Sequence, residues 1–475
     1  MAIEKKDAVF AFAKHMVSVK YEDIPPGAIE STKMSILGTL GPAIAASTTV
    51  PVCKQMMELA KEMGGKQEST IIAYGVKVPC YMASFVNAAL AHGLNFGDVC
   101  EEYLSHPGVV IFPAALAMAE RVGKVSGKEF ITAFTLALDI IVRLGRSLVL
   151  KEAPRDWIRY GWLPPQILGY FSAAAVAGRL LGLDEHQMVK AFGLAYSQTA
   201  GITEEVAGVG VDKAIYPSYA GLAGVLSALM AQKSITGPTH SLEGKNGLFN
   251  VYFQGEYDSS SLIRDLGKTF EGVNIGFFSF PCCAHTHAYI ETALQMVDEN
   301  KFRPENVETV TLFVGSLEKE ALGLCDPLEV RRNPTNTSEA QLSLPYTVAT
   351  AMTQGKPRIK HFVGGGFKDP EILRLSNKVV CQADSEYGQK VGRGMTRPAI
   401  EIKLTDGRML HSDRKVFRYG HPQNPMSKEE HIEKFSDCVS YSVKPLPKDS
   451  LEELIKMLTK LEEVDDVTEI IRLVS

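Results

Sequence analysis

Three polar residues, Asn95, Asp98 and His106, interrupt a part of the chain that is largely apolar or small. They lie in the stretches 91–98 and 105–108, and the sequence becomes apolar again from Val109 onward. A polar group that is buried without a partner costs roughly 2–7 kcal/mol, so such residues must be hydrogen-bonded or take part in chemistry. This segment is therefore the first candidate for an active site.

A helix end and two glycines bring these residues together in the predicted local structure. If residues 82–94 form a helix, Asn95 and Asp98 are three positions apart and face the same side where it ends. Gly97 and Gly108 permit the turns that return the histidine toward them. The segment thus predicts a cluster of an amide, a carboxylate and an imidazole.

The pair of Asp98 and His106 has two interpretations. An aspartate beside a histidine supplies a general base and the group that orients it, which suits the movement of a proton on or off carbon. On this interpretation His106 is the general acid/base and Asp98 orients it. In the structural alternative, Asp98 caps a helix and His106 is a hydrogen-bonded core histidine. The residues alone leave both interpretations open.

Lys213 is a single lysine that precedes a long run of small apolar residues. A lysine in such a place is often functional, either as a partner for a carboxylate or as a base with a lowered pKa. The alternative is a surface lysine that pairs with Asp212, Glu204 or Glu205. We take Lys213 as a candidate catalytic residue.

Two histidines, His285 and His287, stand just before a predicted helix. His285 is placed to point into a cleft while His287 enters the helix. A metal site needs further ligands, and none is near in the sequence. The glycine-rich stretch 363–366 lacks the Lys-Ser/Thr pair of a phosphate loop, and the chain has no convincing dinucleotide fingerprint. We expect neither a metal nor an organic cofactor.

The first part of the chain, residues 1–266, has the three-to-four spacing of apolar residues that is typical of helices. The stretches 172–178 and 220–228 are rich in alanine and glycine, which lets helix backbones approach closely. We expect a tightly packed, all-helical domain here.

The pattern changes after residue 263 and predicts a smaller α+β domain. Residues 307–314 alternate as a strand does, and 399–404 with 409–411 form a hairpin closed by an Asp-Gly turn. The helical domain is expected over 1–266 and 412–475, with the α+β domain over 267–411 between its two parts. Helices are predicted at 287–300, 340–352, 370–379, 427–435 and 450–473.

The composition is that of an ordinary globular protein and excludes several functional classes. With 22% charged residues and a net charge of −5, nothing attracts the chain to nucleic acid or to an anionic membrane. The eight cysteines lack zinc-binding spacing, so reduced thiols are expected. Residues 1–21 lack the apolar core of a secretory signal, and the apolar stretches 134–142 and 167–181 contain or adjoin charges. We expect a cytoplasmic protein without membrane spans.

Several motifs stand in order along most of the chain: Phe85-Val-Asn-Ala-Ala-Leu-Ala-His92, Ser105-His106-Pro107, Gly127-Lys-Glu-Phe-Ile-Thr-Ala-Phe134, Gly161-Trp162, Ala195-Tyr-Ser-Gln-Thr-Ala-Gly201, Lys213, Pro281-Cys-Cys and Ser338-Glu-Ala-Gln-Leu-Ser-Leu-Pro-Tyr346. Together they resemble the MmgE/PrpD family, which includes 2-methylcitrate dehydratase, cis-aconitate decarboxylase and iminodisuccinate epimerase.

The resemblance implies a mainly helical protein with a smaller α/β domain, an active site in the cleft between the two, and a homodimer. Members of the family act on small di- or tricarboxylates without a metal or organic cofactor. Their shared chemistry is proton movement at a carbon next to a carboxylate, followed by loss of water, loss of CO2 or return of the proton to the other face.

The resemblance also assigns residues to the site. His106 and Lys213 fall on positions where the family has active-site residues, and Asp98 lies on its acidic segment. The candidate contacts to a small carboxylic-acid substrate are Asn95, Tyr160 and His285.

At several positions the chain departs from the family. The family usually has Asp-Phe-Asp-Asp where this chain has Asn95 and Gly97 in place of the first and third residues. Val99 replaces a common threonine, Leu163 replaces a histidine that follows Gly-Trp, and Phe278 replaces a lysine. Each change removes a charge or a hydrogen-bonding group, which would leave an anionic substrate group without a partner. We therefore expect a substrate with fewer carboxylates or with a bulkier apolar part.

The leading functional hypothesis is a dehydratase, that is, a lyase that abstracts a proton next to a carboxylate and releases water from a small hydroxy acid. A cofactor-independent epimerase needs fewer groups and is the first alternative, and a decarboxylase is the second. A catalytically inactive relative that binds a metabolite is a hypothesis of another class. The retention of His106 and Lys213 argues against it.

Overall fold

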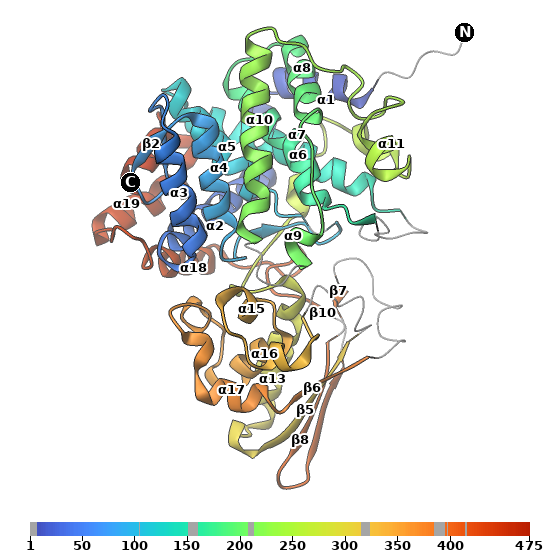
Figure 1. Ribbon diagram of the computed structural model, residues 1–475, viewed down its shortest axis with the longest axis vertical. Coiled ribbons are helices and arrows are strands. Elements are labelled where there is room, and N and C mark those ends of the chain that lie inside the picture. The colour runs from blue at the N-terminus through green and yellow to red at the C-terminus, as the bar shows by residue number, and fades with distance from the viewer. Residues whose placement is uncertain are drawn as a thin grey trace. The chain divides into compact units, whose positions relative to one another are not determined.

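The computed structural model describes residues 7–103, 105–150, 160–207, 213–314, 324–383, 395–396, 398–413 and 416–475. The chain divides into two compact units (Figure 1). The first consists of Met1–Glu205, Lys213–Ile275 and Ser427–Ser475, and the second mainly of Gly276–Met426. The predicted domain boundaries, after residues 266 and 411, stand earlier in the chain than the boundaries of these units.

The first unit is mainly helical, as the sequence predicts. Its helices are α1 (Ala8–Ser18), α2 (Pro26–Thr49), α3 (Pro51–Met63), α4 (Cys80–His92), α5 (Gly108–Val122), α6 (Gly127–Ser147), α7 (Pro164–Leu180), α8 (Glu185–Tyr196), α10 (Tyr216–Gln232), α11 (Leu248–Phe253), α12 (Ser259–Ile263), α18 (Lys428–Val439), α19 (Lys448–Thr459) and α20 (Thr468–Leu473). The short helix α9 (Glu204–Ala207) spans a boundary of this unit: Glu204 and Glu205 belong to the first unit, and Val206 and Ala207 to the second.

Helices α7 and α10 pack directly on each other in the interior of this unit. A methyl group added at Gly224 of α10 would lie 2.3 Å from Cβ of Ala173 in α7. One added at Gly169 would lie 3.2 Å from Cβ of Ala220. The close approach of the two backbones confirms the prediction made from the small residues in these stretches.

The first unit is not all-helical, which corrects one part of the prediction. Strands β1 (Ser69–Ile71) and β2 (Val76–Val78) form an antiparallel hairpin. Ala73 and Gly75 both have positive φ and make its turn. Each strand has only three residues, which is too short to show the alternation of a strand against the helical pattern around it.

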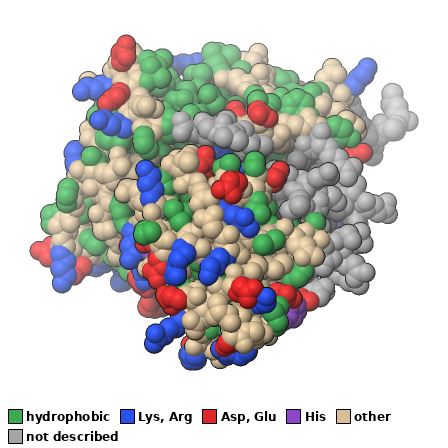
Figure 2. All heavy atoms as spheres, turned by 60° about the horizontal axis from the view of Figure 1, so that its bottom comes forward, with side chains coloured by type: hydrophobic (Ala, Val, Ile, Leu, Met, Phe, Trp, Pro, Cys, Tyr) green, Lys and Arg blue, Asp and Glu red, His purple; other side chains and the backbone are tan. Residues whose placement is uncertain are grey.

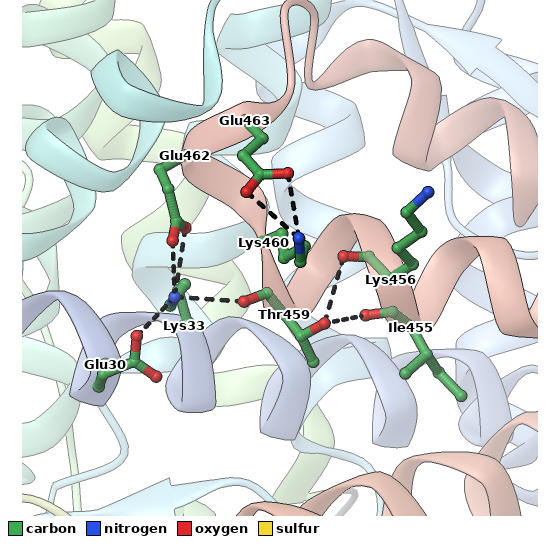
Figure 3. Close-up of polar contacts among 8 residues, drawn as sticks. All are labelled: Glu30, Lys33, Ile455, Lys456, Thr459, Lys460, Glu462 and Glu463. Carbon is green, nitrogen blue, oxygen red and sulfur yellow. Dashed lines mark hydrogen bonds and ion pairs between the residues drawn. The ribbon is translucent and has the colours of Figure 1, made fainter.

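The C-terminal helices belong to the first unit. Lys33 of α2 is buried, and its Nζ donates to the carbonyl of Thr459 and to the carboxylate of Glu462, each at 3.2 Å (Figure 3). Burial opposes the charge of Lys33, but the bonds to Glu30 and Glu462 outweigh it and raise the pKa of Lys33. These contacts fix the end of α19 against α2.

Helix α18 also packs on α2, and a capping box marks its first turn. The Ser427 hydroxyl accepts from the N–H of Glu430, and the Glu430 carboxylate accepts from the N–H of Ser427. This capping box satisfies two N–H groups at the helix start. The buried side of the helix carries Lys434 and Phe435 inward.

The second unit contains a four-stranded sheet with the order β6-β5-β8-β9. Its strands are β5 (Val307–Val314), β6 (Val379–Ala383), β8 (Ala399–Leu404) and β9 (Met409–Asp413). Strands β5 and β6 are parallel and the other pairs are antiparallel. The predicted strand 307–314 and the predicted hairpin are confirmed.

Helices lie on one side of this sheet (Figure 1). They are α13 (Ala284–Asn300), α16 (Leu344–Gln354) and α17 (Pro370–Ser376). The remaining short elements of this part of the chain are β4 (Gly276–Phe277), α14 (Leu328–Arg332), α15 (Thr337–Gln341), β7 (Met395–Thr396) and β10 (Val416–Phe417).

Three predicted helices of the second unit differ in extent from the observed ones. The predicted helix 287–300 begins earlier, at Ala284. The predicted helix 340–352 is divided into α15 and α16, because the Ser343 hydroxyl accepts from the N–H of Tyr346 and starts a new helix. The predicted helix 370–379 ends at Ser376, and Val379 begins β6.

Within the described residues, one stretch, Lys213–Gln232, is long and apolar enough to cross a membrane, and α2 and α3 pass the same test only as a bent pair. The stretch is 67% buried inside the structure, as a core helix of a globular domain is. On the face shown in Figure 2, Lys and Arg side chains are interspersed with Asp and Glu side chains.

Candidate functional site

The Asp98 carboxylate is fully buried and caps the N-terminal end of helix α5. It accepts a hydrogen bond of 2.6 Å from the Ser35 hydroxyl, and both of its oxygens lie 3.0 Å from the N–H of Gly108. This N–H has no partner inside the helix, and a carboxylate at a helix N-terminus is favourable. Gly108 is required here because a Cβ would lie 2.5 Å from Oγ1 of Thr39 and 2.7 Å from the carboxylate.

His106 is oriented by the main chain of Asp98. Its Nδ1 lies 2.8 Å from the Asp98 carbonyl oxygen. A carbonyl only accepts, so Nδ1 carries the proton, and in the neutral ring Nε2 is left as the basic nitrogen. The prediction that Asp98 orients His106 is therefore modified. The orienting contact comes from its carbonyl, while its carboxylate caps the helix.

His92, the last residue of α4, contacts the rings of both His106 and Tyr216. Its ring centroid lies 5.1 Å from that of His106 and 4.7 Å from that of Tyr216. Burial lowers the pKa of His92 well below its usual range, and the charges of His106 and Lys213 lower it further. His92 is thus a neutral imidazole in contact with the candidate base.

Sequence analysis did not single out His92 or Tyr216. A histidine that ends an apolar helix and a tyrosine that begins one are both ordinary core residues. Only the tertiary structure places them beside His106. The one signal in the sequence was the position of His92 at the start of the polar segment.

Lys213 begins a turn of 3-10 helix, Lys213–Ile215, directly before α10. It is half-buried and close enough to His92 to affect its pKa. Of the partners considered for a surface lysine, Asp212 lies outside the described residues. The position of Lys213 near His92 places a positive charge where the carboxylate of a substrate could bind.

The predicted helix 82–94 ends earlier than expected. Helix α4 ends at His92, and Asn95 has a positive φ of 47°. Asparagine tolerates this left-handed conformation better than most residues do. Gly97 is not among the residues with positive φ, so the turn depends on Asn95 instead. Asn95 and Asp98 therefore follow the helix and do not share one of its faces.

Tyr160 and His285 lie in different units. Tyr160 is half exposed and precedes Gly161, whose carbonyl accepts from the N–H of Thr203 at 2.8 Å. His285 is half-buried in the first turn of α13 in the second unit. That both contact one substrate, in a cleft between the units, stays a prediction.

The apolar residues at the divergent positions are all buried. Val99 and Leu163 lie in the first unit, and Phe278 lies in the second, where its ring is 5.5 Å from the Arg418 guanidinium. Among the described residues, no group of three or more His, Cys, Asp or Glu side chains is arranged to hold a metal ion.

Lys434 of α18 contacts the segment that contains Asp98. It is only 7% exposed, and its Nζ lies 4.1 Å from the centroid of the Phe96 ring, two residues before Asp98. Burial raises the pKa of Asp98 to about 6, whereas the hydrogen bonds from Ser35 and Gly108 and the charge of Lys434 lower it.

Replacing Lys434 with methionine is expected to destabilise the protein more at about pH 8 than at about pH 5. The pKa of Asp98 is raised from 3.8 to about 6 in the folded protein, so stability falls as pH rises between these values. Loss of the lysine charge raises this pKa further and extends the fall to higher pH. Urea unfolding at both pH values measures the effect.

Two variants of α18 serve as controls for this experiment. Lys434→Arg keeps the charge and is expected to retain the wild-type pH dependence. Lys428→Met removes an exposed lysine from the same helix and is expected to change it little. Equal destabilisation by Lys434→Met at both pH values would refute the coupling to Asp98.

Comparisons with known proteins extend over nearly the whole chain. The MmgE/PrpD N-terminal domain matches residues 11–260 and the MmgE/PrpD C-terminal domain matches residues 280–460. Cis-aconitate decarboxylase of Mus musculus is 24% identical over 474 residues, which cover 98% of this chain and 93% of the relative. The Homo sapiens protein of the same name is 24% identical, with 97% and 93% covered. That of Aspergillus terreus is 21% identical, with 95% and 93% covered. The chain therefore belongs to the MmgE/PrpD family.

Proposed function

We propose that the protein is a lyase that removes a proton from the carbon next to a carboxylate of a small hydroxy acid and then releases water. The observation that carries the proposal is the cluster of His106, His92 and Lys213, in which the Asp98 carbonyl fixes the tautomer of His106. His106 is the base, acting through Nε2, and Lys213 binds the carboxylate beside the reacting carbon.

The charges of this cluster suit a carbanion next to a carboxylate. When the proton leaves carbon, negative charge spreads onto the carboxylate oxygens, and a fixed ammonium group beside them stabilises it. Burial keeps His92 uncharged, so it can contact the substrate or His106 without adding a further positive charge. The base and the cation thus have separate tasks.

Decarboxylation is the second candidate reaction. It is favoured by the names of the relatives, since the Mus musculus, Homo sapiens and Aspergillus terreus proteins are cis-aconitate decarboxylases. Five residues argue against cis-aconitate itself as the substrate, because they lack the polar groups that are usual in the family. They are Asn95, Gly97, Val99, Leu163 and Phe278. We infer a substrate with fewer carboxylates than a tricarboxylate.

The test is a panel of carboxylic acids offered to the purified protein in D2O. We would use malate, citramalate, 2-methylcitrate and cis-aconitate, and would follow alkene absorbance, CO2 release and deuterium incorporation. Dehydration gives an alkene without CO2, and decarboxylation gives CO2. Epimerisation gives deuterium exchange alone. Turnover of 2-methylcitrate or cis-aconitate at an ordinary enzymatic rate would refute the inference about the substrate.

A further inference from the structure

Two polar oxygens near the candidate site are buried and have no hydrogen-bond partner among the described residues. They are Oε1 of Gln166 in α7 and Oε2 of Glu205 in α9. Gln166 is only 2% exposed. A buried acceptor without a partner is costly, and such groups in a native protein often face a ligand or an ordered water.

Both side chains belong to one polar cluster around Tyr170. The Tyr170 hydroxyl interacts with the Gln166 side chain and with the main chain of Ala200, and the charge of Glu205 acts on it. The Tyr170 side chain itself is buried in α7. The cluster therefore lies where α7 meets the segment that leads into α9.

The cluster is linked electrostatically, through Tyr216, to the rings around the proposed base. The charge of Glu205 also acts on Tyr216, whose ring contacts His92, which in turn contacts His106. The charge of Glu205 thus acts on both Tyr170 and Tyr216. The proposed dehydration has so far assigned no role to this carboxylate.

The protonation state of Glu205 suits an acid. Burial raises the pKa of its carboxyl group. A carboxyl group with a raised pKa keeps its proton closer to neutral pH, which is how enzymes prepare a carboxylic acid for proton donation. It also avoids placing a second negative charge beside a carboxylate substrate.

We propose that Glu205 is the general acid that protonates the departing hydroxyl group, and that Gln166 accepts a hydrogen bond from the same hydroxyl. The inference rests on the proposed dehydration. His106 takes the proton from carbon, and the electron pair of that C–H bond forms the C=C bond. The C–O bond breaks, and the oxygen leaves as water with the proton of Glu205. His106 then releases its proton to solvent, and the Glu205 carboxylate takes up a proton from solvent.

The test compares Glu205→Gln with Glu204→Gln, its exposed neighbour in the same short helix. With malate or citramalate, whichever the wild type dehydrates, Glu205→Gln is expected to lower kcat by about 10²-fold, at the lower end for a general acid. Fluorosuccinate carries fluoride in place of the hydroxyl, and fluoride leaves with less need of a proton. The loss on fluorosuccinate is therefore expected to be several times smaller. Glu204→Gln is expected to match the wild type on both.

The outcomes separate this inference from the proposed function. If the wild type dehydrates no hydroxy acid, the proposed function fails. If it does, but Glu205→Gln behaves like Glu204→Gln or loses as much activity on both leaving groups, only the role of Glu205 fails.

An infrared difference spectrum between wild type and Glu205→Gln tests the acid independently of activity. We expect a carboxylic-acid C=O band in the wild type at mildly acidic pH that the variant lacks. Glu205→Asp, which keeps the carboxyl group, is expected to retain the band and part of the activity. Absence of the band from the folded wild type would overturn the proposal.

Discussion

Replacing His106 with asparagine is expected to lower kcat/KM by about 10⁴-fold, the upper end of what a general base contributes. No later step can proceed without removal of the proton from carbon, so this loss should exceed that caused by any other single change in the site. The asparagine amide N–H can still donate to the Asp98 carbonyl, which keeps the segment in place. The variant thus removes the base and leaves the orienting contact.

The measurement is steady-state kinetics together with deuterium exchange into the substrate. His106→Asn should lose both turnover and exchange, while His186→Asn, which changes an exposed histidine, should lose neither. His92→Asn provides the comparison inside the site. If exchange survives in His106→Asn but is lost in His92→Asn, then the neutral His92 is the base and His106 is not.

Local patterns predicted those parts of the fold that depend on neighbours in sequence. The alternation in 307–314 and the Asp-Gly turn between 399–404 and 409–411 were enough to place β5, β8 and β9. The hairpin of β1 and β2 was missed because each strand has only three residues. Helix α4 ends before the expected residue because Asn95 adopts positive φ.

The candidate site was harder to predict because its contacts join distant segments. The polar residues 95–106 could be recognised from their contrast with the apolar sequence around them. The partners of Asp98 could not, since Ser35 comes from α2 and Lys434 from the C-terminal helix α18. Sequence alone therefore left open whether the carboxylate acts on His106 or caps a helix, and its contacts with Ser35 and Gly108 decide for the cap.

A second large effect is expected on stability. Replacing Arg143 with methionine should lower the free energy of unfolding by about 3–5 kcal/mol, the cost of leaving one member of a buried ion pair without its partner. Arg143 and Asp139 of α6 are both buried, and Nε of Arg143 lies 2.9 Å from the Asp139 carboxylate. Removal of the guanidinium would leave that buried carboxylate without its arginine partner.

The same guanidinium holds the chain after α12. It donates to the carbonyl of Arg264 at 2.7 Å and to that of Thr269 at 2.6 Å, while Asp139 accepts from the N–H of Glu271 at 2.7 Å. His15 of α1 lies 3.3 Å from the same carboxylate. One ion pair thus joins α1, α6 and the segment 264–271, so the loss should extend beyond a single contact.

Urea unfolding of four variants, Arg143→Met, Arg146→Met, Asp139→Asn and the double variant of Asp139 and Arg143, separates the effect of breaking the buried ion pair from that of removing an arginine charge. Arg146→Met removes an arginine of the same helix that is 33% exposed and pairs with the partly exposed carboxylates of Glu102 and Glu271. It is expected to cost about 1 kcal/mol, because solvent screens these pairs. Asp139→Asn combined with Arg143→Met should cost less than the two single changes added together, because neither charge is then left alone. If Arg143→Met were no more destabilising than Arg146→Met, burial would not be the reason that this ion pair matters.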